Sequence, residues 1–142
     1  TNNWYKLKKK KIKNIKNINL INSSLKEMYS YINKVDLVIA RGGYNTISEC
    51  LVLKKPSILS YEANNPEVKE NVRIMKKNNL CSSMTYSDWS KDRFKKKIDS
   101  FLKREYNFIL RNILKNKFKN DGSTQIVKDI KKELKKYGKN YC

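Results

Sequence analysis

The chain has 142 residues, enough for one domain with its own core, and a formal charge of +20 from 33 Lys and Arg against 13 Asp and Glu. Only five of these basic residues are arginines and the lysines run from end to end, so nucleic acid is not the expected partner. The absence of histidine and the wide spacing of three cysteines exclude histidine-based catalysis and the usual zinc patterns, so no metal site is expected.

The first elements of the chain are basic and short. Residues 1–16 are predicted to be a solvated basic lead-in, and residues 17–142 to form the folded domain. Residues 17–22 alternate polar and apolar side chains, which predicts a short strand. A helix should follow, with Leu25, Met28, Tyr29 and Ile32 on its buried face.

The middle of the chain alternates between apolar runs and amphipathic segments. Residues 35–40 (VDLVIA) predict a strand covered on both faces, followed by Arg-Gly-Gly and a helix over about residues 45–53. Residues 57–61 predict the next strand, and Pro66 suits the first turn of another helix that ends near residue 79. Residues 80–84 predict one further short strand.

The last third of the chain is expected to be helical. A helix opening at residues 87–89 should bury Phe94, Ile98, Phe101 and Leu102, and residues 105–119 are weakly helical. The closing helix has Ile126, Ile130 and Leu134 at steps of four. The alternation of strands and helices predicts an α/β fold, a Rossmann-like parallel sheet with flanking helices and its ligand crevice at the carboxyl edge.

The Arg41-Gly42-Gly43 break stands at that edge, between a buried strand and a helix. Glycines there can adopt positive φ and let a ligand approach the backbone. The first N–H groups of a helix lack internal partners, and the helix dipole favours an anion at that end, so a diphosphate would fit. Asn45 and Thr46 could add donors, and Glu49 could accept hydrogen bonds from a ribose diol.

A purely structural interpretation of the same residues is equally available. A Gly-Gly pair after a strand is often only a tight turn. Thr46 and Glu49 also have the spacing of a capping box, in which Thr46 caps the helix and Glu49 bonds back to its N–H.

The wider pattern resembles the C-terminal domain of the family-28 glycosyltransferases. The residues that carry the resemblance are V-D-L-V-I-A, R-G-G-Y-N-T-I-S-E and L-K-K-P-S-I-L within residues 35–59, with a looser likeness from residue 17 to the end. The resemblance implies one half of a GT-B fold, truncated at its N-terminus. It also implies that this half binds a nucleotide-sugar donor, usually UDP-linked, while a missing N-terminal domain holds the acceptor and the catalytic base.

The resemblance implies a set of substrate-binding residues and leaves the catalytic residues unknown. The glycine loop would lie against the diphosphate, and the glutamate of the motif, Glu49, would bind the ribose; the loop residues are Gly42, Gly43, Tyr44, Asn45 and Thr46. Arg41 matches the arginine of the motif and could equally be half of a structural ion pair. The family usually has His-Gln and a later Asn after the next strand; here Glu67 and Val68 replace His-Gln, and Asn71 matches the Asn.

The function expected from this resemblance is transfer of a hexose or N-acetylhexosamine from a nucleotide sugar, with no cofactor. The family includes a bacterial enzyme that acts on a lipid-linked muramyl-pentapeptide, so a lipid-linked acceptor and peripheral contact with the inner face of a membrane are open alternatives. Three other functions remain as alternatives. The chain could be a nucleotide-sugar hydrolase or epimerase of the same fold, a basic module that binds nucleic acid or anionic surfaces, or a domain that has lost activity. Free thiols favour the cytoplasm, and no apolar run approaches the roughly 20 residues of a membrane span.

Overall fold

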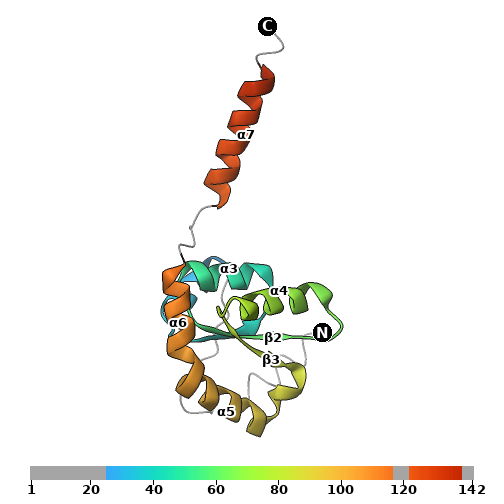
Figure 1. Ribbon diagram of the computed structural model, residues 1–142, viewed down its shortest axis with the longest axis vertical. Helices are drawn as coiled ribbons and strands as arrows, with labels where there is room; N and C mark the ends of the chain where they lie inside the picture. Colours follow the sequence, from blue (N-terminus) through green and yellow to red (C-terminus); the bar gives the residue numbers. More distant parts are fainter. Residues whose placement is uncertain (1–24, 117–121, 139–142) are drawn as a thin grey trace. The chain divides into compact units, whose positions relative to one another are not determined.

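The computed structural model describes residues 25–116 and 122–138 (Figure 1). By its internal contacts the chain divides into residues 1–31 and 32–142, and the sheet and core lie in the second unit. The predicted lead-in at 1–16 and the predicted strand at 17–22 fall outside the described residues. The first described helix, α2, spans Leu25–Asn33; its Ile32 is buried as expected, whereas Met28 and Tyr29 are exposed.

The centre of the fold is a three-stranded parallel sheet in the order β1-β2-β3. The strands are β1 (Val38–Arg41), β2 (Ser57–Tyr61) and β3 (Ser82–Thr85). Val38 pairs with Ser57 and Arg41 with Ser60, and on the other side Ile58 pairs with Ser82. The predicted α/β fold with a Rossmann-like parallel sheet is confirmed.

The first strand is shifted towards its C-terminus relative to the predicted range of 35–40. The Val35 N–H donates to the Ile32 carbonyl at 3.4 Å, so Val35 closes the preceding helix instead of joining the sheet. Pairing begins at Val38 and extends to Arg41. Arg41 therefore belongs to the strand, and Gly42 is the first residue beyond it.

Helices lie on both sides of the sheet. Figure 1 shows α3 (Tyr44–Val52) and α4 (Pro66–Lys77) along one face and α5 (Lys91–Ser100) on the other side, leading to α6 (Tyr106–Lys115). The two crossovers β1-α3-β2 and β2-α4-β3 join strands that are neighbours in the sheet, so both place their helices on the same face by the right-handed rule.

The core is built around the central strand. Ile58 and Leu59 of β2 are fully buried on opposite faces, because alternate residues of a strand point to opposite sides. Phe101 is also fully buried and meets Tyr106 edge to face, with ring centroids 6.0 Å apart. The other buried members of this cluster come from all the layers: Ile47, Val72, Met75, Leu80, Cys81, Met84, Ile109 and Ile113.

The segment after β3 is more irregular than the sequence predicts. A short 3-10 turn, η1 (Tyr86–Trp89), precedes α5, and a π-helical turn, η2 (Phe101–Glu105), joins α5 to α6. Asp88 accepts hydrogen bonds from the Thr85 N–H at 2.7 Å and the Thr85 hydroxyl at 2.9 Å, which holds the start of η1. Leu102, predicted to be buried, is exposed because the π turn offsets it from the face of α5.

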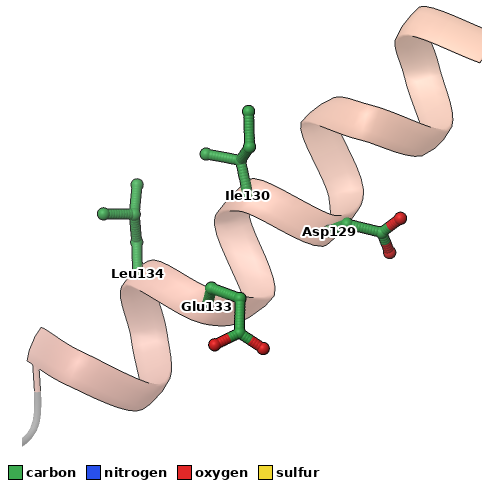
Figure 2. Close-up of a pocket in the computed structure, with 4 residues that line it drawn as sticks. All are labelled: Asp129, Ile130, Glu133 and Leu134. Atoms are coloured by element: carbon green, nitrogen blue, oxygen red, sulfur yellow. The ribbon is translucent and has the colours of Figure 1, made fainter.

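The last described helix, α7, spans Gly122–Gly138. Figure 2 shows Ile130 and Leu134 on one side of it and the carboxylates of Asp129 and Glu133 on the other. These four residues line a shallow hollow that belongs to α7 alone. The apolar side chains spaced four residues apart are more than half exposed, at 60% for Ile126, 53% for Ile130 and 65% for Leu134. Within the described residues, no helix is long and apolar enough to span a membrane.

Candidate functional site

The two glycines carry the backbone from the end of β1 to the start of α3. The Gly42 N–H donates to the Ser60 carbonyl of β2 at 2.9 Å, and the Gly43 N–H donates to the Arg41 carbonyl at 2.8 Å. Gly43 has φ −72° and ψ 147°, and no described glycine has positive φ. The positive φ that glycine allows is therefore not used here, and these positions matter because they have no side chain.

The surroundings of the two glycines differ. A Cβ at Gly42 would collide with Cγ2 of Val72 and would lie 3.6 Å from both Cγ1 of Val68 and the Ser60 carbonyl oxygen. A Cβ at Gly43 would meet nothing within 4 Å. Gly42 thus lets α4 pack onto the loop, whereas Gly43 leaves open space beside the start of α3.

The N-terminus of α3 has free donors. Gly43 is the N-cap, its carbonyl accepts the Ile47 N–H at 3.1 Å, and no side chain in the described part of the chain caps this end. The amides of Tyr44, Asn45 and Thr46 precede that first helical bond, so they are donors without intrahelical partners. Together with the helix dipole they form a local anion-binding arrangement.

The alternative capping box at Thr46 and Glu49 is not formed. The helix begins at Tyr44, one residue earlier than predicted, so Thr46 lies inside its first turn and cannot act as the N-cap. The pairing of Arg41 with Ser60 shows where the strand ends and hence where the helix can begin.

The side chains of α3 separate into an inner and an outer set. Ile47 and Cys50 are buried and anchor the helix to the sheet. Tyr44 is 70% exposed at the first helical position and Asn45 is also exposed, while Thr46 and Glu49 are half-buried. Glu49 lies three residues after Thr46, about one turn further along the same helix.

The remaining two predicted residues belong to α4. The Asn65 side chain caps this helix by accepting the Val68 N–H at 3.1 Å, and Pro66 occupies its first turn as predicted. Glu67 is exposed in that first turn. Asn71 is half-buried, and its Nδ2 is fully buried without a hydrogen-bond partner among the described residues. A buried amide without a partner is costly, so it marks a position where a ligand or water would be stabilised.

An ion pair spans the carboxyl ends of the first two strands. Arg41 Nε lies 3.1 and 3.0 Å from the two carboxylate oxygens of Glu62, the residue that follows β2. Both side chains are about half exposed, at 52% and 41%. Arg41 thus forms a structural ion pair, which was one of the two roles that the sequence allowed for it. Glu62 was missed, although its position one residue past a parallel strand was the available signal.

Two other groups of residues bear on the chemistry of the chain. Burial raises the pKa of Cys50 to about 11, helped by the nearby Glu49 charge, and burial raises the pKa of Cys81 to about 12. Both are free, buried thiols, as predicted, and unsuited to nucleophilic attack. The described residues hold no group of three His, Cys, Asp or Glu side chains that could bind a metal.

The aromatic side chains are less buried than the sequence suggested. Phe101 is in the core, but Tyr44, Trp89 and Phe108 are exposed at 70%, 46% and 49%. Trp89 stacks on Phe94 with ring centroids 5.4 Å apart. Exposed aromatic rings of this kind are compatible with base stacking, so a nucleic-acid interface stays open as an alternative.

Comparison with known proteins gives one match. The model of the glycosyltransferase family 28 C-terminal domain matches residues 2–134, nearly the whole chain. No curated protein and no solved structure matches it. The matched range covers the glycine loop, α3, α4 and most of α7.

Proposed function

Since the chain belongs to glycosyltransferase family 28, we propose that it is the donor-binding domain of a transferase that moves a hexose or N-acetylhexosamine from a UDP-linked sugar. The observation that carries this proposal is the uncapped N-terminus of α3 beside the open space at Gly43. The donor diphosphate would lie there, against the amides of Tyr44, Asn45 and Thr46.

The proposed role of this end of α3 is electrostatic. Negative charge develops on the leaving diphosphate as the bond to the sugar breaks. Backbone N–H groups already oriented at that position stabilise the charge without reorganising, and stabilisation of this kind supplies much of the rate enhancement of many enzymes. Gly42 contributes indirectly, because its lack of a side chain lets Val72 and Val68 hold α4 against the loop.

The other predicted residues would bind the rest of the donor. Glu49 would accept hydrogen bonds from the ribose hydroxyls, since carboxylates are good diol acceptors. The unpartnered Nδ2 of Asn71 would donate to a sugar hydroxyl, which would supply the hydrogen bond that it lacks. Glu67 is exposed in the first turn of α4, where family members usually have His-Gln. It would bind the donor sugar in their place.

The acceptor side of the reaction lies outside these residues. We propose that a second domain holds the acceptor and supplies the catalytic base, and that the reaction takes place in the cytoplasm, where the free thiols of Cys50 and Cys81 would remain reduced. A lipid-linked acceptor, with the domain at the inner membrane surface, is part of the same proposal.

Calorimetric titration of the protein with UDP tests the donor site. Gly43→Val should weaken UDP binding at least tenfold, because the new side chain would fill the open space while the extended backbone accepts it without strain. Glu49→Gln should weaken it about tenfold, the usual scale of a hydrogen bond to a charged group. Glu133→Gln on α7 removes the same charge from an exposed position and is the matched control.

Several results would count against the donor site. UDP affinity that is unchanged by both Gly43→Val and Glu49→Gln would contradict it, provided that circular dichroism shows the variants folded. Binding to random-sequence DNA tighter than about micromolar at physiological salt, with no response to UDP, would favour a basic nucleic-acid module instead.

A further inference from the structure

A second feature that suits anions lies on α4, apart from the residues of the donor site. Lys69, Arg73 and Lys76 follow one another at i, i+4 and i+7, which places them on one stripe of the helix. With Tyr61 of β2, Ser83 of β3 and Val72 they line a cavity of about 220 Å³. The cavity is thus lined by three basic residues of one helix and by one residue from each of two neighbouring strands.

We propose that this cavity, the α4 cationic cavity (Tyr61, Lys69, Val72, Arg73, Lys76, Ser83), binds a phosphate-bearing group. Its volume is below the roughly 300–1,000 Å³ of sites for drug-sized ligands, so it suits a small group such as one or two linked phosphates. Lysine and arginine are the side chains that form charge-assisted hydrogen bonds to phosphate.

The cavity is separate from the end of α3. None of its polar residues belongs to the glycine loop, α3, or the Glu67 and Asn71 positions of the donor site. The two regions share only a wall, because Val72 faces the cavity and also occupies the space beside Gly42. The proposal therefore does not depend on the proposed donor site.

One carboxylate moderates the positive charge of the cavity. Glu70 accepts hydrogen bonds from Arg73 Nε and Nη2, both at 2.6 Å, and these bonds hold the pKa of the Glu70 carboxyl below its ordinary value. The Glu70 carboxylate therefore already neutralises part of the Arg73 charge that would attract a phosphate. Removing the Glu70 charge should release the guanidinium and strengthen phosphate binding.

Titration with inorganic pyrophosphate, followed by calorimetry and by the amide shift of Ser83, tests the proposal on the full chain. Lys69→Gln with Lys76→Gln should weaken binding at least tenfold, the scale of a lost charge-assisted hydrogen bond. Lys95→Gln with Lys96→Gln is the matched control, because these exposed lysines of α5 carry the same charge and do not line the cavity. Glu70→Gln should tighten binding several-fold.

Three outcomes would overturn the assignment. A failure of pyrophosphate to bind would contradict the proposal. Equal weakening by the two double-lysine variants would show that binding depends only on the overall charge of the protein. Binding that is lost in Gly43→Val but kept in Lys69→Gln/Lys76→Gln would place the phosphate at α3 instead. This last comparison keeps the cavity and the donor site experimentally distinct.

A second experiment distinguishes a lipid headgroup from a free phosphate compound as the ligand. Phosphatidylcholine vesicles are compared with and without phosphatidic acid, which presents a phosphomonoester headgroup. Sedimentation with the acidic vesicles that requires Lys69 and Lys76 would support a lipid headgroup as the ligand. Binding of soluble pyrophosphate without vesicle association would support a free phosphate compound.

Discussion

Val72 occupies the space that any side chain at residue 42 would need, and this contact fixes α4 over the end of β1. One glycine of the loop is thereby constrained by packing, while its neighbour Gly43 faces open space. The two glycines, adjacent and alike in the sequence, therefore have separable roles.

Gly42→Ala is expected to destabilise the protein by about 1–3 kcal/mol, the usual cost of inserting a methyl group into a packed site. Gly43→Ala is the matched control and should change stability by less than about 0.5 kcal/mol, since its Cβ has room and its φ suits alanine. Urea unfolding of both variants measures the difference. Equal stabilities would show that Val72 moves aside without cost.

The Arg41–Glu62 pair should contribute little to stability. Both side chains are about half exposed, and exposed pairs are worth roughly 0.2–1 kcal/mol. A double-mutant cycle with Arg41→Gln and Glu62→Gln should give a coupling energy in that range that shrinks at high salt. A coupling well above it would show that the pair is screened from solvent, as it would be beneath another domain.

The pH dependence of stability should reflect Asp88. Hydrogen bonds from the Thr85 N–H and hydroxyl hold the pKa of the Asp88 carboxyl below its ordinary value of 3.8. A lowered pKa means that the contribution is present above that ordinary value and is lost as the pH falls through the folded-state value. Asp88→Asn should cost roughly 0.5–1 kcal/mol at pH 7, the lower part of the range for capping side chains.

The same variant should differ less from the parent protein in strongly acidic solution. The measurement is urea unfolding at pH 7 and again at successively lower pH, as the parent carboxyl becomes protonated. A difference that stays constant between these conditions would contradict the assigned hydrogen bonds. Asp99→Asn, an exposed position on α5, controls for the loss of one carboxylate.

The buried thiols of Cys50 and Cys81 should be unreactive in the folded protein. Burial raises the pKa of Cys50 to about 11 and that of Cys81 to about 12, so almost no thiolate exists at pH 8. In a Cys142→Ser background, alkylation by iodoacetamide at pH 8 should be negligible until urea unfolds the protein. Rapid alkylation of the native protein would show local opening of the core.

The raised pKa values of the two thiols also determine how stability changes with pH. The contribution to stability is complete below the ordinary thiol pKa of 9.0 and is lost as the pH rises towards 11 and 12. The parent protein should therefore lose more stability between pH 8 and pH 10.5 than a Cys50→Ala/Cys81→Ala variant does. Equal slopes would leave no thiol contribution.

The sequence was sufficient for the sheet and for most helix positions. Residues 57–61 were predicted as a strand and are β2, and Pro66 was predicted to start a helix and does so. These predictions succeeded because short apolar runs and helix-terminal residues act locally. The family match over residues 2–134 agrees with the resemblance carried by the glycine motif.

The errors arose where distant contacts decide the local structure. The collision between a Cβ at Gly42 and Val72 is a contact across 30 positions that no local pattern reveals. The burial of Met28, Tyr29 and Leu102 was inferred from helical periodicity, which indicates a face but not whether anything covers it.

The sequential strand order has a consequence for how the chain is made. Within the described sheet, each strand pairs with the strand that precedes it in the sequence, β2 with β1 and β3 with β2. Every pairing partner has therefore already been synthesised when the next strand emerges from the ribosome, and only one crossover must close each time. The sheet can thus grow stepwise in the direction of translation.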